Sequence, residues 1–245
     1  MGNTGLVGHL QRLIAFDLDG TLIDSRRDLA DSANQLIAGL GGRALPEEAV
    51  GRMVGDGARV LVDRALTAAG LADPGDALPR FLQIYDSRLL VHTQPYPGVR
   101  AAIEAARRGA RVTMLTNKPL HHTARIVAAL GWTPLFDEVV GGDNPLGRKP
   151  EPKALQAMMT AAGVSAGQTM LVGDSKVDLD TARRAGVRCC LVSFGFGFES
   201  VDKAPIEGEA VVTDVAALVA EIEAFVRGAA FRRPDHGPAE AGPHD

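Results

Sequence analysis

From about residue 98 onward, short apolar runs alternate with segments whose apolar residues recur at helical spacing. The predicted strands are 111–116, 139–140, 169–174, 188–194 and 211–212. The predicted helices are 99–108, 123–130, 153–162, 177–186 and 215–225. Strands that alternate with helices of this length are typical of βαβ units and a parallel sheet. The apolar run at residues 13–18 is the natural first strand of that sheet.

Between residue 25 and about residue 95 the strand pattern disappears, and four helical segments take its place. They are 26–42, 46–53, 57–71 and 76–90, with Gly, Pro or Asp between them. An all-helical segment inserted after the first strand of a parallel sheet predicts a separate lid. The stretch "HTQPYPGV" at the end of this segment holds two prolines and a glycine, as a linker should.

We therefore predict an α/β fold, a doubly wound, Rossmann-like parallel sheet with a small inserted α-helical cap domain. The core domain comprises residues 1–24 and 96–227, and the cap comprises residues 25–95. The remaining residues, 228–245, are rich in Pro, Gly, Ala and charge, so we expect a disordered tail. Its histidines, His236 and His244, are predicted to be solvated and not to bind a metal.

Composition excludes some classes of partner. Lys plus Arg is 26 against 30 for Asp plus Glu, a net charge of −4, which favours neither nucleic acid nor an anionic membrane surface. The adjacent Cys189 and Cys190 are interpreted as buried thiols in a reducing cytosol. No secretory signal pattern and no run that could span a bilayer are found. We expect a cytoplasmic protein.

Candidate chemistry begins at "DLDGT", where the first strand ends. An Asp-Gly turn explains Asp19 and Gly20, but it does not explain Asp17 one step inside an apolar strand. A calcium loop needs three alternate oxygen-bearing residues before its glycine, and only two are present. Buried carboxylates are costly unless their charge is compensated.

Other polar residues follow later strands. Thr116 and Asn117 end the second core strand, and Lys149 precedes the helix that begins near residue 152. Asp174 and Asp178 follow the strand "TMLVGD". Each alone has a structural explanation, such as a helix N-cap or a solvated loop.

Taken together, these residues predict one site. Ligands bind outside the carboxyl ends of the strands in open α/β sheets, where Asp17, Thr116 and Asp174 are all expected. A cluster of carboxylates without histidine or cysteine suits a hard cation with oxygen ligands, so we predict Mg²⁺ as the cofactor.

In their order along the chain, "DLDGT", "LTN", "KPEP" and "GDSKVD" resemble the four motifs of the haloacid dehalogenase-like hydrolases. The resemblance covers about residues 13–225, and the helical insert is similar to the small cap of that superfamily. Within it, "RMVGDGARVLVDRAL", "TNKP" and "GGD" look most like the phosphoglycolate phosphatases.

The resemblance implies that Asp17 is the nucleophile that attacks phosphorus to give an aspartyl-phosphate. Asp19 would protonate the leaving oxygen and then activate water. The dehalogenases lack this second aspartate, so its presence favours phosphoryl chemistry. Mg²⁺ would be held by Asp17, Asp174 and the backbone carbonyl of Asp19, with Asp178 in support of the metal or of Lys149.

The remaining implied roles concern binding. Lys149 would neutralise charge, and Thr116 and Asn117 would donate hydrogen bonds to the phosphoryl group. In the cap, Arg59 either pairs with a substrate carboxylate or is a surface residue of a helix turn.

The leading hypothesis is a Mg²⁺-dependent phosphatase of a small phosphate ester, with 2-phosphoglycolate favoured. Alternatives are a phosphatase for a sugar phosphate, an amino-sugar phosphate or a nucleotide, and a β-phosphoglucomutase-like phosphomutase. A non-catalytic binding protein of the same fold is disfavoured because the catalytic residues are complete. A homodimer is left open.

Overall fold

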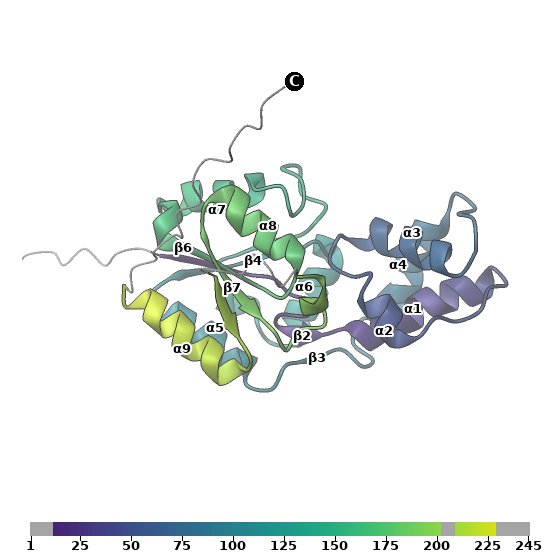
Figure 1. Ribbon diagram of the computed structural model, residues 1–245, viewed down its shortest axis with the longest axis horizontal. Coiled ribbons are helices and arrows are strands. Elements are labelled where there is room, and N and C mark those ends of the chain that lie inside the picture. The colour runs from purple at the N-terminus through teal and green to yellow at the C-terminus, as the bar shows by residue number, and fades with distance from the viewer. Residues whose placement is uncertain (1–11, 202–208, 229–245) are drawn as a thin grey trace, which may run out of the picture.

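A six-stranded parallel sheet forms the centre of the computed structural model, which describes residues 12–201 and 209–228 (Figure 1). The order across the sheet is β5-β4-β1-β6-β7-β8. The strands are β1 Leu13–Phe16, β4 Arg111–Leu115, β5 Glu138–Val140, β6 Thr169–Gly173, β7 Arg188–Val192 and β8 Ala210–Val212. Phe16 lies beside Met114 of β4 and Val172 of β6, so β1 occupies the middle of the sheet.

Helices cover both faces of the sheet. They are α5 Val99–Arg107, α6 Leu120–Ala129, α7 Lys153–Ala162, α8 Lys176–Ala185 and α9 Val215–Val226. Helices α5 and α9 lie on one face, and α7 and α8 lie on the other (Figure 1). Side chains of β1 alternate between the faces, because Ile14 and Phe16 join one buried cluster while Leu13 and Ala15 join the second. The predicted doubly wound α/β fold is confirmed.

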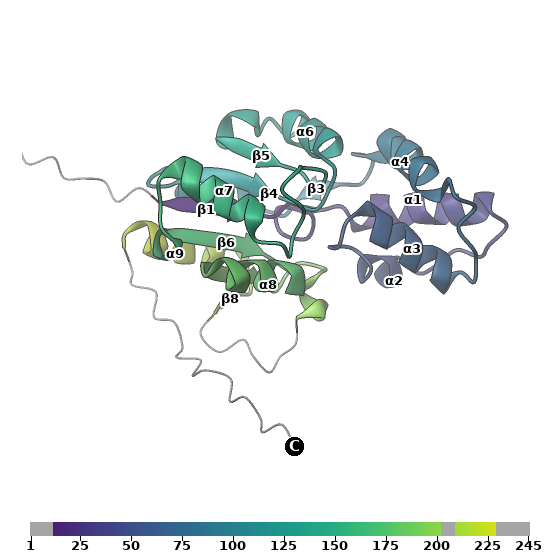
Figure 2. The same cartoon turned by 90° about the horizontal axis from the view of Figure 1, so that it is seen from above.

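Four helices stand beyond one end of the sheet in both views (Figures 1 and 2). They are α1 Arg26–Gly39, α2 Glu47–Gly51, α3 Ala58–Ala68 and α4 Ala77–Arg88. Their apolar faces pack on one another through buried side chains such as Leu36, Leu66 and Phe81. All four fall within residues 25–95, which we call the cap; the division of the chain into two domains stays a prediction.

Sequence patterns missed a small antiparallel pair, β2 Ile23–Asp24 with β3 Gln94–Pro95. These two strands lie where the chain leaves the sheet for the cap and where it returns. Next to them, the buried Asp28 carboxylate accepts hydrogen bonds from the backbone N–H groups of His92 and Thr93. The two crossings of the chain are therefore held together.

Most predicted boundaries agree with the structure to within a few residues. Helix α6 begins at Leu120 and not at the predicted Thr123, because Pro119 precedes its first turn and its carbonyl accepts from the Thr123 N–H at 3.0 Å. Short 3₁₀ helices lie at Thr133–Leu135, Ala166–Gln168 and Phe198–Ser200.

Three predictions concern residues away from the site. Cys189 and Cys190 are both buried and free, as predicted. Among the described residues, no helix is long and apolar enough to cross a bilayer. The tail from residue 229 onward, with His236 and His244, lies outside the described residues.

Candidate active site

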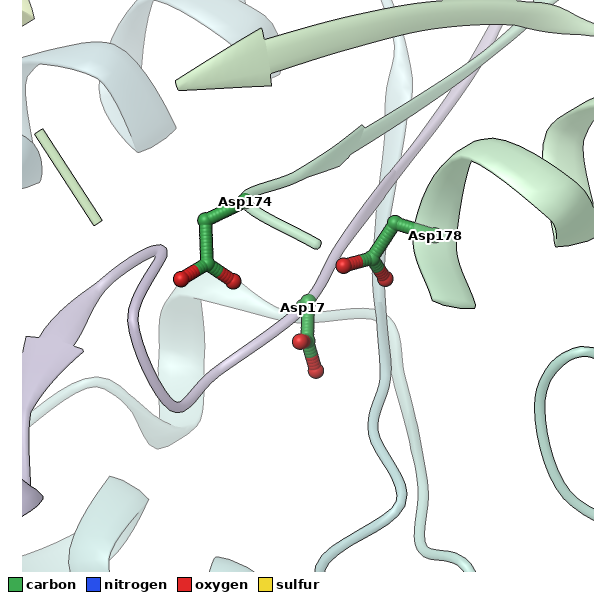
Figure 3. Close-up of side chains that lie close together, drawn as sticks. All are labelled: Asp17, Asp174 and Asp178. Atoms are coloured by element: carbon green, nitrogen blue, oxygen red, sulfur yellow. The ribbon is translucent and has the colours of Figure 1, made fainter. Parts of the chain in front are cut away.

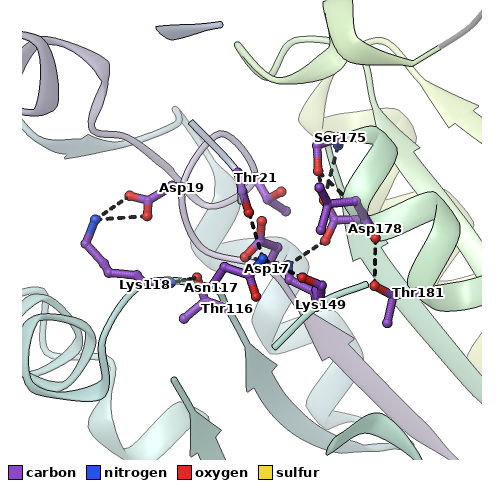
Figure 4. Close-up of polar contacts among 12 residues, drawn as sticks. Asp17, Asp19, Thr21, Thr116, Asn117, Lys118, Lys149, Ser175, Asp178 and Thr181 are labelled. Atoms are coloured by element: carbon purple, nitrogen blue, oxygen red, sulfur yellow. Dashed lines mark hydrogen bonds and ion pairs between the residues drawn. The ribbon is translucent and has the colours of Figure 1, made fainter. Parts of the chain in front are cut away.

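Three adjacent strands bring the predicted polar residues to one edge of the sheet. Asp17 follows β1, Thr116 follows β4 and Asp174 follows β6, and β1 pairs with both of the others. Parallel strands end at the same edge, so their following residues converge there. Figure 4 shows Asp17 and Thr116 together with Lys149 and Asp178, and Figure 3 shows Asp174 beside Asp17.

Asp17, Asp174 and Asp178 form a compact carboxylate cluster (Figure 3). One oxygen of each lies within 4.8 Å of the others, and all three residues are buried. Asp178 sits in the first turn of α8, where its Oδ2 accepts from the Ser175 N–H and hydroxyl at 3.1 and 2.6 Å. The cluster is therefore fixed by the strand ends and by a helix cap.

Glycine makes room for these carboxylates. A Cβ on Gly20, whose φ is +82°, would lie 1.9 Å from Asp174 Oδ2, and one on Gly173 would lie 2.2 Å from Asp178 Cγ. Neither distance is compatible with a side chain. The glycine of "DLDGT" is thus required by space as well as by backbone conformation.

Lys149 is the cation inside the cluster. Its Nζ lies 2.9 Å from Asp17 Oδ1 and donates to Asp178 Oδ1 at 2.6 Å. Burial alone would lower the pKa of Lys149, but the attraction of Asp17 and Asp178 outweighs it and raises that pKa. Lys149 is therefore a permanent positive charge.

One lysine does not balance three buried carboxylates. Burial raises the pKa of Asp17 to about 6, with Lys149 opposing the shift and Asp178 adding to it. Burial, followed by the nearby Asp178 and Asp17 charges, holds the pKa of Asp174 well above its usual range. Carboxylates that are destabilised in this way fit a hard cation, which would compensate their charge. The three carboxylates could thus hold a divalent metal ion.

Asp19 lines the same pocket, and its carboxylate is bound by Lys118, a residue for which the sequence predicts no role. Lys118 Nζ donates to both carboxylate oxygens of Asp19 at 2.9 Å (Figure 4), and the Ser25 hydroxyl donates to Oδ1 at 2.5 Å. The Lys118 side chain is only 3% exposed. The sequence signals for Lys118 were its place directly after Thr116 and Asn117 and its inclusion in the stretch "TNKP".

Thr116 and Asn117 are at the site, but the amide is already engaged. Asn117 Nδ2 donates to the Gly55 carbonyl of the cap at 2.8 Å and to the Lys149 carbonyl at 2.9 Å. Both of its amide hydrogens are thus used, and the predicted donation from this side chain to a phosphoryl group does not fit this arrangement. Thr116 Oγ1 accepts from the Lys118 N–H at 3.3 Å, which leaves its own hydrogen available.

Arg59 is not brought to the site. Its side chain is 44% exposed and pairs with Asp73 at 3.1 Å and Asp63 at 3.6 Å. Asp63 lies one helical turn further along α3, which is the spacing that favours such a pair. The surface alternative for Arg59 therefore describes this structure.

A pocket opens over the carboxylates and is closed on its far side by the cap. Asp17, Asp19, Thr116 and Asp174 line it from the core. Cap residues, including Leu29, Phe81, Leu82 and Tyr85, form the opposing wall. The catalytic candidates thus face a pocket whose lining is largely apolar.

Residues 11–186 match the family model of the haloacid dehalogenase-like hydrolases. The chain belongs to this family. A phosphoglycolate phosphatase of Rhodospirillum rubrum is 40% identical over 218 residues, which cover 85% of this chain and 90% of that protein. A phosphoglycolate phosphatase of Mesorhizobium japonicum is 36% identical, with 89% and 97% covered. The prediction of a hydrolytic enzyme of this family is confirmed.

Solved structures agree with the fold. The crystal structure of a predicted phosphoglycolate phosphatase from Haemophilus somnus superposes with a TM-score of 0.78 at 28% identity. The match covers 89% of this chain and 97% of that one, so it extends over both the sheet and the cap helices.

Proposed function

We propose that this protein is a Mg²⁺-dependent phosphatase that hydrolyses 2-phosphoglycolate to glycolate and phosphate through an aspartyl-phosphate. The observation that carries the proposal is the pairing of Asp17, at the end of the central strand, with Lys149 at 2.9 Å beside a further pair of buried carboxylates. The names of the relatives in Rhodospirillum and Mesorhizobium support the choice of substrate.

In the first step an Asp17 oxygen attacks phosphorus, and the bond from phosphorus to the ester oxygen breaks. Asp19, which lines the same pocket, gives its proton to the departing oxygen. In the second step Asp19 takes a proton from water, the water oxygen bonds to phosphorus, and the bond to Asp17 breaks. Inorganic phosphate leaves and both aspartates are regenerated.

Repulsion between the Asp17 carboxylate and a phosphate dianion has to be offset. Asp17, Asp174 and the Asp19 carbonyl would hold Mg²⁺, which supplies positive charge at the phosphoryl oxygens when bound. Lys149 supplies a second, permanent positive charge, and Asp178 holds the Lys149 ammonium in place at 2.6 Å. The Thr116 hydroxyl is positioned to donate to the transferring group.

A substrate panel tests the proposal. The purified protein is assayed with Mg²⁺ against 2-phosphoglycolate, glucose 6-phosphate, glucosamine 6-phosphate and a nucleoside monophosphate, with phosphate release as the readout. We expect the largest kcat/KM for 2-phosphoglycolate, loss of turnover in EDTA, and recovery on addition of Mg²⁺. A strong preference for a sugar or nucleotide ester would reject the substrate while keeping the chemistry.

The same preparation separates a phosphatase from a phosphomutase. With β-glucose 1-phosphate, a mutase would form glucose 6-phosphate, whereas a phosphatase would release inorganic phosphate. Hydroxylamine or borohydride trapping during turnover, followed by peptide mapping, is expected to locate the covalent adduct at Asp17. An adduct elsewhere would reject the assigned nucleophile.

A further inference from the structure

Three polar side chains that the hydrolytic steps do not use gather on one wall of the pocket. They are Lys118, after β4, His122, in the first turns of α6, and Tyr85, on cap helix α4. Lys118 Nζ lies 4.7 Å from the centre of the Tyr85 ring, and the Tyr85 and His122 rings lie 5.4 Å apart. This wall, which we call the Lys118 wall, joins the core to the cap.

Two of these groups have unused hydrogen-bonding capacity. The Tyr85 hydroxyl and His122 Nδ1 are buried and have no hydrogen-bond partner among the described residues. Tyr85 is 2% exposed and His122 is 5% exposed, so bulk water does not supply the missing hydrogen bonds. A buried donor without an acceptor is costly, and such groups are kept where a ligand supplies the missing partner.

The charge on this wall points to an anion. Among the described residues that line the pocket, Lys118 is the single lysine or arginine, and the Lys149 ammonium is paired with Asp17 and Asp178. Lys118 is bound to Asp19, which also accepts from Ser25 and therefore keeps a partner if the ammonium turns away. A second anion inside the pocket would find its countercharge here.

The apolar residues around the Lys118 wall limit which chemical groups the anion can have attached to it. Leu29, Phe81 and Leu82 surround the wall with apolar surface. Sugar hydroxyl groups placed against these side chains would lose hydrogen bonds to water without replacement. A carboxylate that is separated from the phosphate ester by one or two atoms needs only the Lys118 ammonium and the Tyr85 hydroxyl as donors.

We propose that the Lys118 wall is the subsite for the carboxylate of the substrate, bound by the Lys118 ammonium and the Tyr85 hydroxyl. This inference rests on the proposed function. It assigns the pairing with a substrate carboxylate to Lys118, whereas the sequence analysis considered Arg59 for that role. Because Tyr85 belongs to the cap and Lys118 to the core, the substrate carboxylate bridges the two. The phosphoryl end lies at Asp17 and the carboxylate end lies at Lys118.

Discrimination between two esters of similar size tests the subsite. The ratio of kcat/KM for 2-phosphoglycolate to that for ethyl phosphate, which lacks the carboxylate, is measured in wild type and in Lys118→Met. We expect the ratio to fall by about 10- to 100-fold, the range that hydrogen bonds to a charged group provide. Lys153→Met, at an exposed lysine outside the pocket, is the matched control and should leave the ratio unchanged.

The ratio separates binding from positioning. Lys118 also holds Asp19, so its loss lowers turnover of both esters; an equal fall for both would mean that Lys118 acts through Asp19 alone and would overturn the subsite. Tyr85→Phe, which keeps the ring, is expected to lower the ratio by about 3- to 10-fold, and it provides the same test should Lys118→Met fail to fold. Wild type that hydrolyses ethyl phosphate but shows no preference for 2-phosphoglycolate overturns the subsite and leaves the phosphatase intact. Wild type without any phosphatase activity overturns both proposals.

Discussion

The two sides of the pocket are built by different means. The carboxylate side consists of residues that directly follow three neighbouring strands, so sheet topology alone brings Asp17, Thr116 and Asp174 together. The opposite side consists of Lys118 and of side chains on α4 and α6, two helices whose approach depends on how the cap packs. Under our proposals the first side carries out the hydrolytic steps, whereas the second selects the substrate. Four predictions test this contrast, beginning with the largest effect.

Loss of the nucleophile should be the most damaging change. Asp17→Asn is expected to lower kcat by about 10⁴-fold or more, the scale seen when an enzyme loses its nucleophile. Initial rates with 2-phosphoglycolate and Mg²⁺ measure it. Asp63→Asn, at an aspartate of the cap that is 52% exposed, is the matched control and should retain full activity. Substantial Mg²⁺-dependent turnover by Asp17→Asn would contradict the covalent route.

The two buried lysines should differ in their effect on stability. Lys149→Met leaves Asp17 and Asp178 without their shared cation, so we expect the free energy of unfolding in EDTA to fall by about 3–5 kcal/mol. Lys118→Met leaves Asp19 with the Ser25 hydroxyl and partial exposure, so about 1–2 kcal/mol is expected. Urea denaturation measures both variants. Equal losses in the two variants would mean that Lys149 and Lys118 stabilise their carboxylate partners to the same extent.

The two sides should also respond to pH with opposite sign in EDTA. The pKa of Asp17 is raised from 3.8 to about 6 by burial, so the folded state keeps a proton that the unfolded state loses, and this contribution to stability falls as pH rises through that window. The pKa of His122 is lowered from 6.5 to about 4 by burial, followed by the nearby Lys118 charge. Its contribution therefore falls as pH drops from 6.5 towards 4.

Variants separate these opposing contributions. Relative to wild type, Asp17→Asn should gain stability as pH rises from about 4 to 6, whereas His122→Gln should gain as pH falls across about the same range, each by about 1–3 kcal/mol. Urea midpoints at closely spaced pH values supply the measurement. If the stability of both variants changed with pH in parallel with wild type, the pKa values of Asp17 and His122 would not be shifted by burial.

The smallest effect is expected at the contact between α4 and α6. Asp86 of the cap pairs with Arg125 and lies 3.3 Å from His121 Nε2, but it is 43% exposed. Asp86→Asn should therefore leave the urea midpoint almost unchanged and raise KM by a small factor, since it weakens only an exposed contact between cap and core. A large fall in kcat would indicate that this pair positions Tyr85 during turnover.

The strand-end half of the site was readable from the sequence because it depends on short-range patterns. An apolar run that stops at Asp17, and another that stops at Asp174, are visible without a structure, and parallel pairing then brings them together. The register of β1 between β4 and β6 converts three separate strand ends into one site.

The side of the pocket that includes Lys118 could not be predicted in the same way. Lys118 meets Asp19 across 99 positions of sequence, and nothing in a loop of that composition states where a lysine side chain turns. The sequence left two alternatives open for Arg59, and the surface alternative describes the structure because Asp63, one turn away, and Asp73, after the helix, both pair with it. Asn117 lies at the site, but its hydrogen bonds to the carbonyls of Gly55 and Lys149 depend on contacts that only the folded chain provides.

The two-stranded pair β2–β3 has a consequence for how such a protein can change. Because the chain leaves the sheet and returns to it through neighbouring, hydrogen-bonded positions, the ends of the inserted segment already meet. Joining them by a short turn adds little loop-closure entropy, so we expect the sheet to tolerate exchange of the whole insert for a shorter or a different one. New substrate ranges could then arise by replacing one segment while the hydrolytic residues stay in register.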